Sequence, residues 1–194
     1  MKQKSRLFTV EPNWFDARQL FNSAIPKGEH SWLFEPGSLT QRLRQLCGDD
    51  FQVRLLKQVW QKPFLGEKGA LQLSNHRYAL VREVALCCGE TPLVYARTII
   101  PDQTLRGAQR RLSNLGTRPL GEVLFSSPKL ARNGFELATV SPVIWGRNDV
   151  EWLSFPEEMV WGRRTVYSIS SHGLLVSEIF MPALFELERA NRTR

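Results

Sequence analysis

The sequence predicts an α+β fold, with a single antiparallel β-sheet and helices packed on one face of it. Two pairs of strand-like segments, within residues 77–100 and 164–181, are each joined by a tight turn, which is typical of antiparallel neighbours. The helical segments come in separate runs, whereas a parallel sheet needs helices that alternate with strands. Of the 194 residues, 42% are hydrophobic. We therefore expect one domain over residues 1–194 with one core.

Two helices are expected in the first fifty residues. Apolar residues recur at helical spacing over residues 13–22, and Pro26 closes that segment. A second amphipathic stretch covers residues 39–46. Ser38 is a suitable N-cap for it and Gly48 a suitable stop, because a hydroxyl can accept the first free N–H groups and glycine tolerates the left-handed turn that ends a helix.

The middle of the chain predicts strands followed by helices. Apolar and polar residues alternate over residues 51–60, which indicates a strand with one solvated face. Residues 77–100 form the predicted central hairpin, which turns at 88–91. Helical spacing then predicts helices over 104–115 and 120–125, and the short linker between them makes an αα-hairpin.

The last third predicts one more strand and a second hairpin. A strand is expected over residues 135–140, and residues 141–161 form an irregular excursion. The last hairpin covers residues 164–181 and turns through 171–173. Residues 183–194 are expected to form one or two helical turns and then fray.

Charge and cysteine content narrow the class of protein. The net charge of +7 favours anionic partners, but lysine and arginine are scattered along the chain, so a nucleic-acid partner is not expected. We see neither a secretory signal nor an apolar run long enough to span a membrane, and we expect a cytoplasmic protein. Cys47, Cys87 and Cys88 fit neither a disulfide framework nor metal-ligand spacing, so we interpret them as reduced packing residues.

Motifs for cofactors and covalent catalysis are missing from the sequence. It contains no glycine-rich phosphate loop and no nucleophile elbow. His30, His76 and His172 lack the spacing of zinc ligands. We therefore expect neither a metal nor an organic cofactor.

Two charged residues fall on apolar strand faces. In steps of two, Arg82 shares a face with Leu80 and Val84, and Glu178 shares one with Val176. A buried guanidinium without a partner is costly, so Arg82 must meet a carboxylate. Either the two residues form a structural salt bridge, or they belong to a pocket in which Arg82 binds a ligand carboxylate and Glu178 handles a hydroxyl or a proton.

Two predicted helix starts could contribute to such a pocket. The helices that begin at Leu39 and Leu120 each offer unpaired backbone N–H groups and a partial positive charge. Most helix starts are simply capped and solvated. Together with Arg82, however, these two could converge on one carboxylate.

Five segments, in this order, resemble the chorismate pyruvate-lyases, which make 4-hydroxybenzoate and pyruvate from chorismate. The segments are WLFEPGSLTQRL (32–43), YALVREVALCCGETPLVYARTIIP (78–101), LSNLGTRPLGEVLF (112–125), WGRRTVYSI (161–169) and GLLVSEIFMP (173–182). The resemblance covers about residues 32–182. It implies an antiparallel sheet with helices on one side and helical flaps over a buried pocket, in agreement with the patterns above.

The resemblance also implies roles for individual residues. Arg82 and the backbone N–H groups of Leu39 and Leu120 would bind the ring carboxylate, and Glu178 would engage the C4 hydroxyl or act as a general acid or base. Arg164 or another outer basic residue is a candidate for the second carboxylate, without support from spacing. The implied enzyme is a monomer without a cofactor that catalyses the first committed step of ubiquinone biosynthesis.

Two other functions stay open. The effector-binding domains of some transcription regulators resemble this fold, so the chain could be a non-catalytic sensor of a small molecule. A divergent lyase that yields another benzoate is the second alternative.

Overall fold

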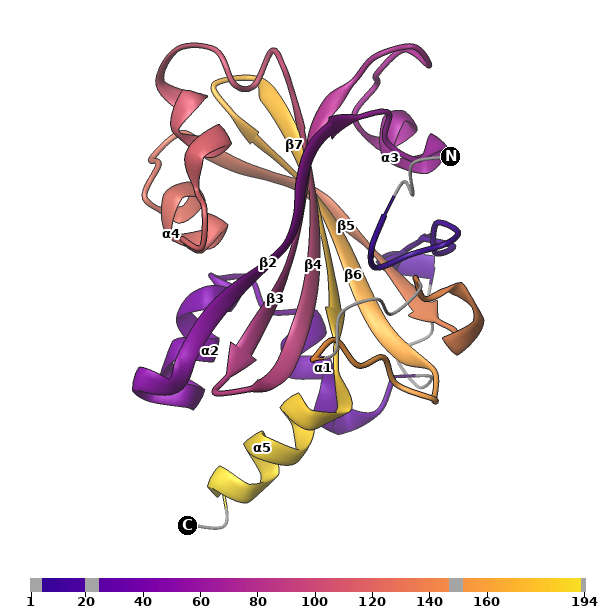
Figure 1. Ribbon diagram of the computed structural model, residues 1–194, viewed down its shortest axis with the longest axis vertical. Helices are drawn as coiled ribbons and strands as arrows, with labels where there is room; N and C mark the ends of the chain where they lie inside the picture. The colour runs from indigo at the N-terminus through magenta and orange to yellow at the C-terminus, as the bar shows by residue number, and fades with distance from the viewer. Residues whose placement is uncertain (1–4, 20–24, 147–151, 193–194) are drawn as a thin grey trace.

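The fold is built on one seven-stranded antiparallel sheet. The computed structural model describes residues 5–19, 25–146 and 152–192. The strands are β1 (Phe15–Asp16), β2 (Phe51–Gln61), β3 (Ala79–Cys88), β4 (Thr91–Pro101), β5 (Leu130–Val140), β6 (Val160–Ile169) and β7 (His172–Phe180). The α-helices are α1 (Lys27–Leu33), α2 (Leu39–Cys47), α3 (Leu65–Ala70), α4 (Leu120–Phe125) and α5 (Pro182–Arg192). The order across the sheet is β1-β5-β6-β7-β4-β3-β2 (Figure 1). The predicted α+β class is confirmed.

The predicted central hairpin is β3 and β4, and it lies inside the sheet. Nearly every residue of both strands is buried, since helices or loops cover both faces. Gly89 begins the two-residue turn with a φ of 55°, a conformation that costs glycine little. The second hairpin is β6 and β7. It turns at Ser170 and Ser171, one residue earlier than predicted, and both serines have positive φ as a type I′ turn requires.

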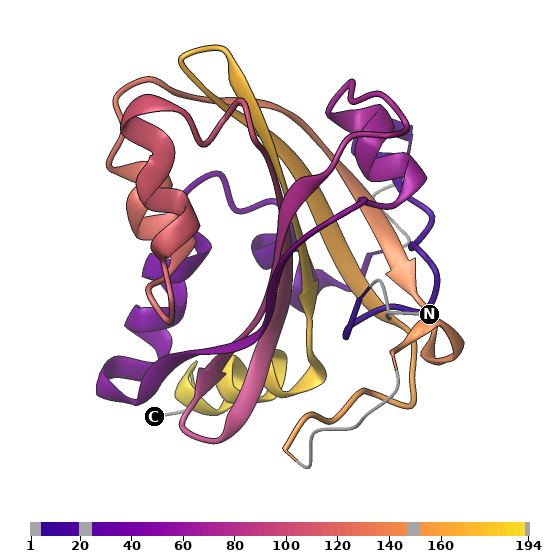
Figure 2. The same cartoon turned by 45° about the horizontal axis from the view of Figure 1, so that its top comes forward.

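Helices cover both faces of the sheet, but unequally. Figure 2 shows α2 and α4 on one side and α3 on the other. On the side of α2 and α4, two apolar clusters form. One joins α1, α2 and α5 to the sheet through residues such as Leu33, Leu43 and Leu184. The other joins α4 through Leu120 and Leu124. We call this side of the sheet the helical face.

The N-terminal region differs from the prediction. Instead of a helix over residues 13–22, it forms β1 and a 3-10 turn at Ala17–Gln19, and residues 20–22 lie outside the described part of the chain. Pro26 precedes helix α1 instead of closing a helix. The start of a helix suits proline, because the N–H group that proline lacks would have no partner within the helix there. Helix α2 agrees with prediction: the Ser38 hydroxyl accepts a hydrogen bond from the Gln41 amide, and Gly48 ends the helix.

Several later elements differ in extent or type. The helix predicted over 104–115 is a 3-10 helix, η4 (Gly107–Asn114). Strand β5 begins five residues before the predicted start, because a bulge accommodates Gly134 with its φ of 72°. Helix α5 is longer than predicted, since Leu184 packs into the core. In the predicted excursion, the structure gives a 3-10 turn at Pro142–Ile144 and describes nothing of residues 147–151.

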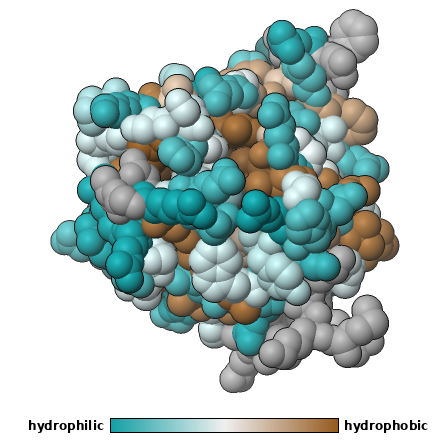
Figure 3. All heavy atoms as spheres, turned by 90° about the horizontal axis from the view of Figure 1, so that it is seen from above, coloured by the Kyte–Doolittle hydropathy of each residue, from teal (hydrophilic) through white to brown (hydrophobic). Residues whose placement is uncertain are grey.

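The surface seen from above mixes hydrophilic side chains with hydrophobic patches (Figure 3). Large apolar side chains exposed in the described chain include Trp60, Leu65 and Tyr78. Scattered exposed apolar residues of this kind are normal on a protein surface. Among the described residues, no helix has the length and apolar character needed to cross a membrane.

Candidate active site

A cavity lies on the helical face between the two apolar clusters. Its volume is about 40 Å³, or about 520 Å³ when the open space at its mouth is included. The lining residues that carry charge or a hydroxyl are Thr40, Arg82, Thr98, Arg163, Tyr167 and Glu178. The other walls are mostly apolar. A mostly apolar lining with a few polar groups is typical of a small-molecule site.

Arg82 is buried in the cavity wall, and none of the described residues provides a carboxylate partner for it. Its exposed fraction is 2%. One terminal nitrogen, Nη2, donates hydrogen bonds to the carbonyls of Gly116 (3.0 Å) and Arg118 (3.1 Å), whereas Nε is buried without a partner. Burial lowers the pKa of Arg82 to about 10, so the guanidinium is still protonated at neutral pH. The site therefore holds an uncompensated positive charge.

Glu178 lines the same cavity but does not pair with Arg82. Its Oε2 accepts a hydrogen bond of 2.5 Å from Nε of Arg163. The structural alternative of an Arg82–Glu178 salt bridge is thus not what the structure shows. Arg163, which the sequence did not single out, also donates to the carbonyls of Trp32 (3.2 Å) and Glu35 (2.9 Å) at the end of α1. Alternation along β6 could have identified it, because Arg163 shares its face with Tyr167.

The two helix starts singled out in the sequence meet at the cavity. Leu39 and Leu120 are the first residues of α2 and α4, and both line the cavity. The first N–H groups of a helix have no partner within the helix. Ser38 caps the Gln41 amide, whereas Pro119, which precedes α4, provides no side-chain cap. The structure thus brings together all four residues proposed from the sequence.

Gly121 allows α2 and α4 to approach each other closely. A Cβ atom at this position would lie 2.6 Å from Oγ1 of Thr40 and 3.2 Å from Oγ of Ser38. A larger residue here must therefore displace the Thr40 side chain or push the start of α4 away from the start of α2. The shared position of the two helix starts depends on this glycine.

We expect Gly121→Ala to weaken binding of 4-hydroxybenzoate, the product that the sequence resemblance implies, by about tenfold or more. It should also lower the free energy of unfolding by about 1–3 kcal/mol, the usual cost of overpacking. Titration calorimetry and urea unfolding would measure the two effects. Gly69→Ala is the matched control, because a Cβ there meets nothing within 4 Å and alanine favours the helix. Unchanged affinity in Gly121→Ala would contradict the proposed role of the helix starts.

Arg164 lies outside the cavity. Its side chain projects from the opposite face of β6 and is bound by Glu11 (3.1 Å) and Glu136 (2.6 Å). Because both carboxylates compensate its charge, Arg164 does not fit the role of anchor for a second substrate carboxylate. That candidate from the sequence is therefore withdrawn.

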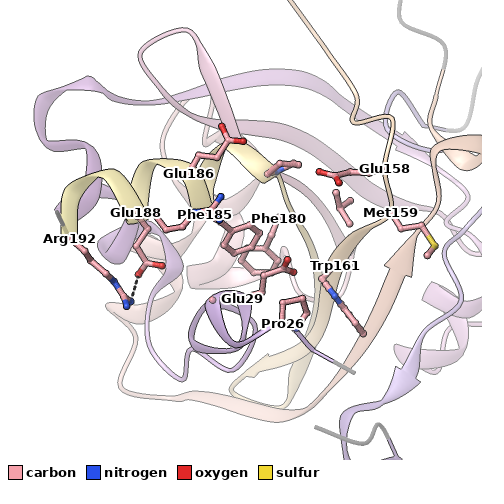
Figure 4. Close-up of a pocket in the computed structure, with 14 residues that line it drawn as sticks. Pro26, Glu29, Glu158, Met159, Trp161, Phe180, Phe185, Glu186, Glu188 and Arg192 are labelled. Atoms are coloured by element: carbon pink, nitrogen blue, oxygen red, sulfur yellow. Dashed lines mark hydrogen bonds and ion pairs between the residues drawn. The ribbon is translucent and has the colours of Figure 1, made fainter. Parts of the chain in front are cut away.

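A larger groove lies between α1, α5 and the start of β6 (Figure 4). Four glutamates and two arginines line it, together with an apolar floor that includes Phe180 and Phe185. Burial, reinforced by the neighbouring Glu158 carboxylate, raises the pKa of Glu29 there. An acidic groove repels carboxylates, so it does not suit an anionic substrate.

Within the described residues, no three His, Cys, Asp or Glu side chains are grouped to hold a metal ion.

Comparison with known proteins decides the family. The family model described as chorismate lyase matches residues 11–190. The chain belongs to the chorismate lyase family. A probable chorismate pyruvate-lyase of Methylococcus capsulatus is 50% identical over 157 residues, which are 81% of this chain and 96% of that protein. Another, of Halorhodospira halophila, is 41% identical over 81% of this chain and 83% of that protein.

A solved structure shares the fold of this chorismate lyase family member. A GntR-family transcriptional regulator from Bacillus cereus superposes with a TM-score of 0.53, over 70% of this chain and 94% of that chain, at 7% identity. At so low an identity the likeness shows the fold alone. Family membership makes the chain an enzyme of the chorismate lyase kind.

Proposed function

We propose that the protein converts chorismate to 4-hydroxybenzoate and pyruvate. The observation that supports this most directly is Arg82, a buried arginine that faces a small cavity and has no carboxylate partner in the described chain. A carboxylate on the ligand would supply the missing partner. Chorismate carries a carboxylate on its ring, and the relatives named above bear the name of chorismate pyruvate-lyase.

The ring carboxylate is held by Arg82 and by the backbone N–H groups of Leu39 and Leu120. Charge-assisted hydrogen bonds of this kind are strong, and the dipoles of the two short helices add to them. The apolar walls around Val84 and Leu124 enclose the ring. In this proposal α2 and the segment from η4 to α4 act as flaps over the bound ring.

The reaction is an elimination that makes the ring aromatic. The bond between ring C3 and the enolpyruvyl oxygen breaks, C4 loses its proton, and the departing enolate takes up a proton to become pyruvate. Because aromatisation makes this step favourable, the protein has mainly to orient the substrate and stabilise the charge on the leaving group. Glu178 contacts the C4 hydroxyl or transfers the proton, and its ion pair with Arg163 fixes its position. No metal or organic cofactor takes part.

The wider setting is also part of the proposal. The 4-hydroxybenzoate would enter ubiquinone biosynthesis as the product of its first committed step. The protein would work in the cytoplasm as a monomer formed by one domain, with chorismate as its partner and without binding nucleic acid.

The test is to incubate the purified protein with chorismate and to follow both products. We expect 4-hydroxybenzoate, identified against its isomers by chromatography, and pyruvate, measured with lactate dehydrogenase, in equal amounts. A different benzoate isomer would indicate a divergent lyase. Folded protein that binds 4-hydroxybenzoate but yields neither product would exclude catalysis and favour an effector sensor.

A further inference from the structure

Arg132 does not itself line the cavity, but it lies next to Tyr167, which does, and it has unused hydrogen-bond donors. Arg132 belongs to the start of β5 and pairs in register with Tyr167 of β6. Its Nη1 donates to the carbonyl of Glu35 (3.0 Å), and its guanidinium lies 5.1 Å from the ring centre of Phe135. Its Nε and Nη2 are both buried without a hydrogen-bond partner. Buried donors of this kind normally have partners, so these two point to a missing acceptor.

Arg132 lies at the same side of the cavity as Glu178. The Glu35 carbonyl accepts hydrogen bonds from Arg132 and from Arg163 (2.9 Å), so the two guanidinium groups are neighbours. Arg163 is in turn bound to Glu178. Glu178, Arg132 and Arg163 all act on the Tyr167 hydroxyl. Burial and the Glu178 carboxylate raise the pKa of Tyr167, and the positive charges of Arg132 and Arg163 offset part of that rise. Arg132 is therefore close to the place proposed for the C4 hydroxyl.

The charges around the cavity do not balance. Arg82 and Arg163 line the cavity and Arg132 lies next to Arg163, so three positive charges are present, whereas Glu178 is the carboxylate that lines the cavity in the described chain. The Glu35 carboxylate is bound by Arg42 (3.2 Å), which Glu188 also binds (3.1 Å), and it acts on Arg163 through space without an ion pair. Two positive charges are thus left over, one at Arg82 and one near Arg132. A ligand with two separate carboxylates would compensate both.

We propose that Arg132 binds the enolpyruvyl carboxylate of chorismate, an assignment that rests on the proposed function. In chorismate the enolpyruvyl group is on C3, next to the C4 hydroxyl. With the ring carboxylate at Arg82 and the C4 hydroxyl at Glu178, the second carboxylate falls on the side of Arg163 and Arg132. Nε and Nη2 of Arg132 form the edge of the guanidinium that can bind a carboxylate with two hydrogen bonds. The same contact stabilises the charge of the departing enolpyruvate.

The experiment compares two ligands that cannot react. One is 4-hydroxybenzoate, with one carboxylate, and the other is 4-hydroxybenzoate with a carboxymethoxy group at C3, which adds a second. In Arg132→Gln we expect the Kd of the dicarboxylate to rise about 10- to 100-fold, which is the loss of a hydrogen bond to a charged group. The Kd of 4-hydroxybenzoate should change less than threefold. The KM for chorismate should rise with the Kd of the dicarboxylate, and Arg132→Lys should restore part of the loss.

Arg18→Gln is the matched control, because it removes the same charge from an exposed side chain bound to Asp16. Equal weakening of both ligands by Arg132→Gln would show that Arg132 merely supports the fold, and no weakening of either would exclude it from the site. Both outcomes overturn the assignment. The calorimetric comparison needs no turnover, so a failure of the proposed reaction is seen separately in the product assay.

Discussion

Replacing Arg82 with methionine is expected to abolish ligand binding without destabilising the protein. Chorismate turnover should fall by about 10²–10³-fold or more, and 4-hydroxybenzoate should no longer bind measurably, because the group that holds the ring carboxylate is gone. The free energy of unfolding should stay within about 1 kcal/mol of wild type or rise. Methionine fills a similar volume, and the change removes a buried charge that has no carboxylate partner.

Urea unfolding, calorimetric titration and the product assay measure these effects together. The carbonyls of Gly116 and Arg118 lose their donor, but both residues are exposed and water can replace it. If Arg82→Met or Arg82→Ala instead lowered the free energy of unfolding by about 3 kcal/mol or more, the arginine would have a structural role. Retained binding of 4-hydroxybenzoate would also contradict the proposed site.

The sequence identified Arg82 and Glu178 because both lie well inside regular strands. Alternation by two assigns a face wherever the strand is certain, and β3 and β7 were predicted almost to their ends. Arg132 and Arg163 were missed because both lie outside the strands that were predicted. Each lies near the start of a strand that was predicted too short: Arg132 comes two residues before Gly134, and Arg163 directly follows Gly162. Neither residue fell within a predicted strand, so no face was assigned to it, although extending the alternation of β6 back by one residue places Arg163 on the face of Tyr167.

The partner of Glu178 could not be predicted from the sequence. Which arginine it meets depends on the order of strands, and that order places β6 next to β7, with Arg163 directly opposite Glu178. Arg82 lies on β3, separated from β7 by β4. A pattern along one strand gives the face of a residue, but not its neighbours across the sheet.

Helix α3 shows a second limit of the sequence. Its six residues include two glycines and show no helical periodicity, so no helix was expected there. Contacts made by one side chain stabilise the helix: the Glu67 carboxylate accepts a hydrogen bond from the Phe64 amide (2.8 Å) and pairs with Arg97. Tertiary contacts of this kind override weak local preference.

Arg97 is buried on the face of the sheet opposite the cavity, and here the charges are compensated. Its Nε lies 2.6 Å from Glu67 and its Nη1 lies 2.6 Å from Glu83, both of which are buried. Glu83 also accepts hydrogen bonds from the Ser5 hydroxyl and the Arg6 amide (2.8 Å). This network joins the N-terminal segment, α3 and the central hairpin.

Replacing Arg97 with methionine is therefore expected to have the opposite effect to Arg82→Met. It leaves two buried carboxylates without their cation, which should lower the free energy of unfolding by at least about 3–5 kcal/mol. The melting temperature should fall by about 10 °C or more, given some 2–4 °C per kcal/mol for a chain of this size. Thermal and urea unfolding measure the loss.

If the single variant does not fold, adding Glu67→Gln and Glu83→Gln should recover a folded protein, because the two neutral amides no longer need a cation. A stable Arg97→Met variant, or no recovery in the triple variant, would show that charge compensation does not distinguish the two faces. The same change at two buried arginines on adjacent strands thus separates an arginine that stabilises the fold from one that is kept for a ligand.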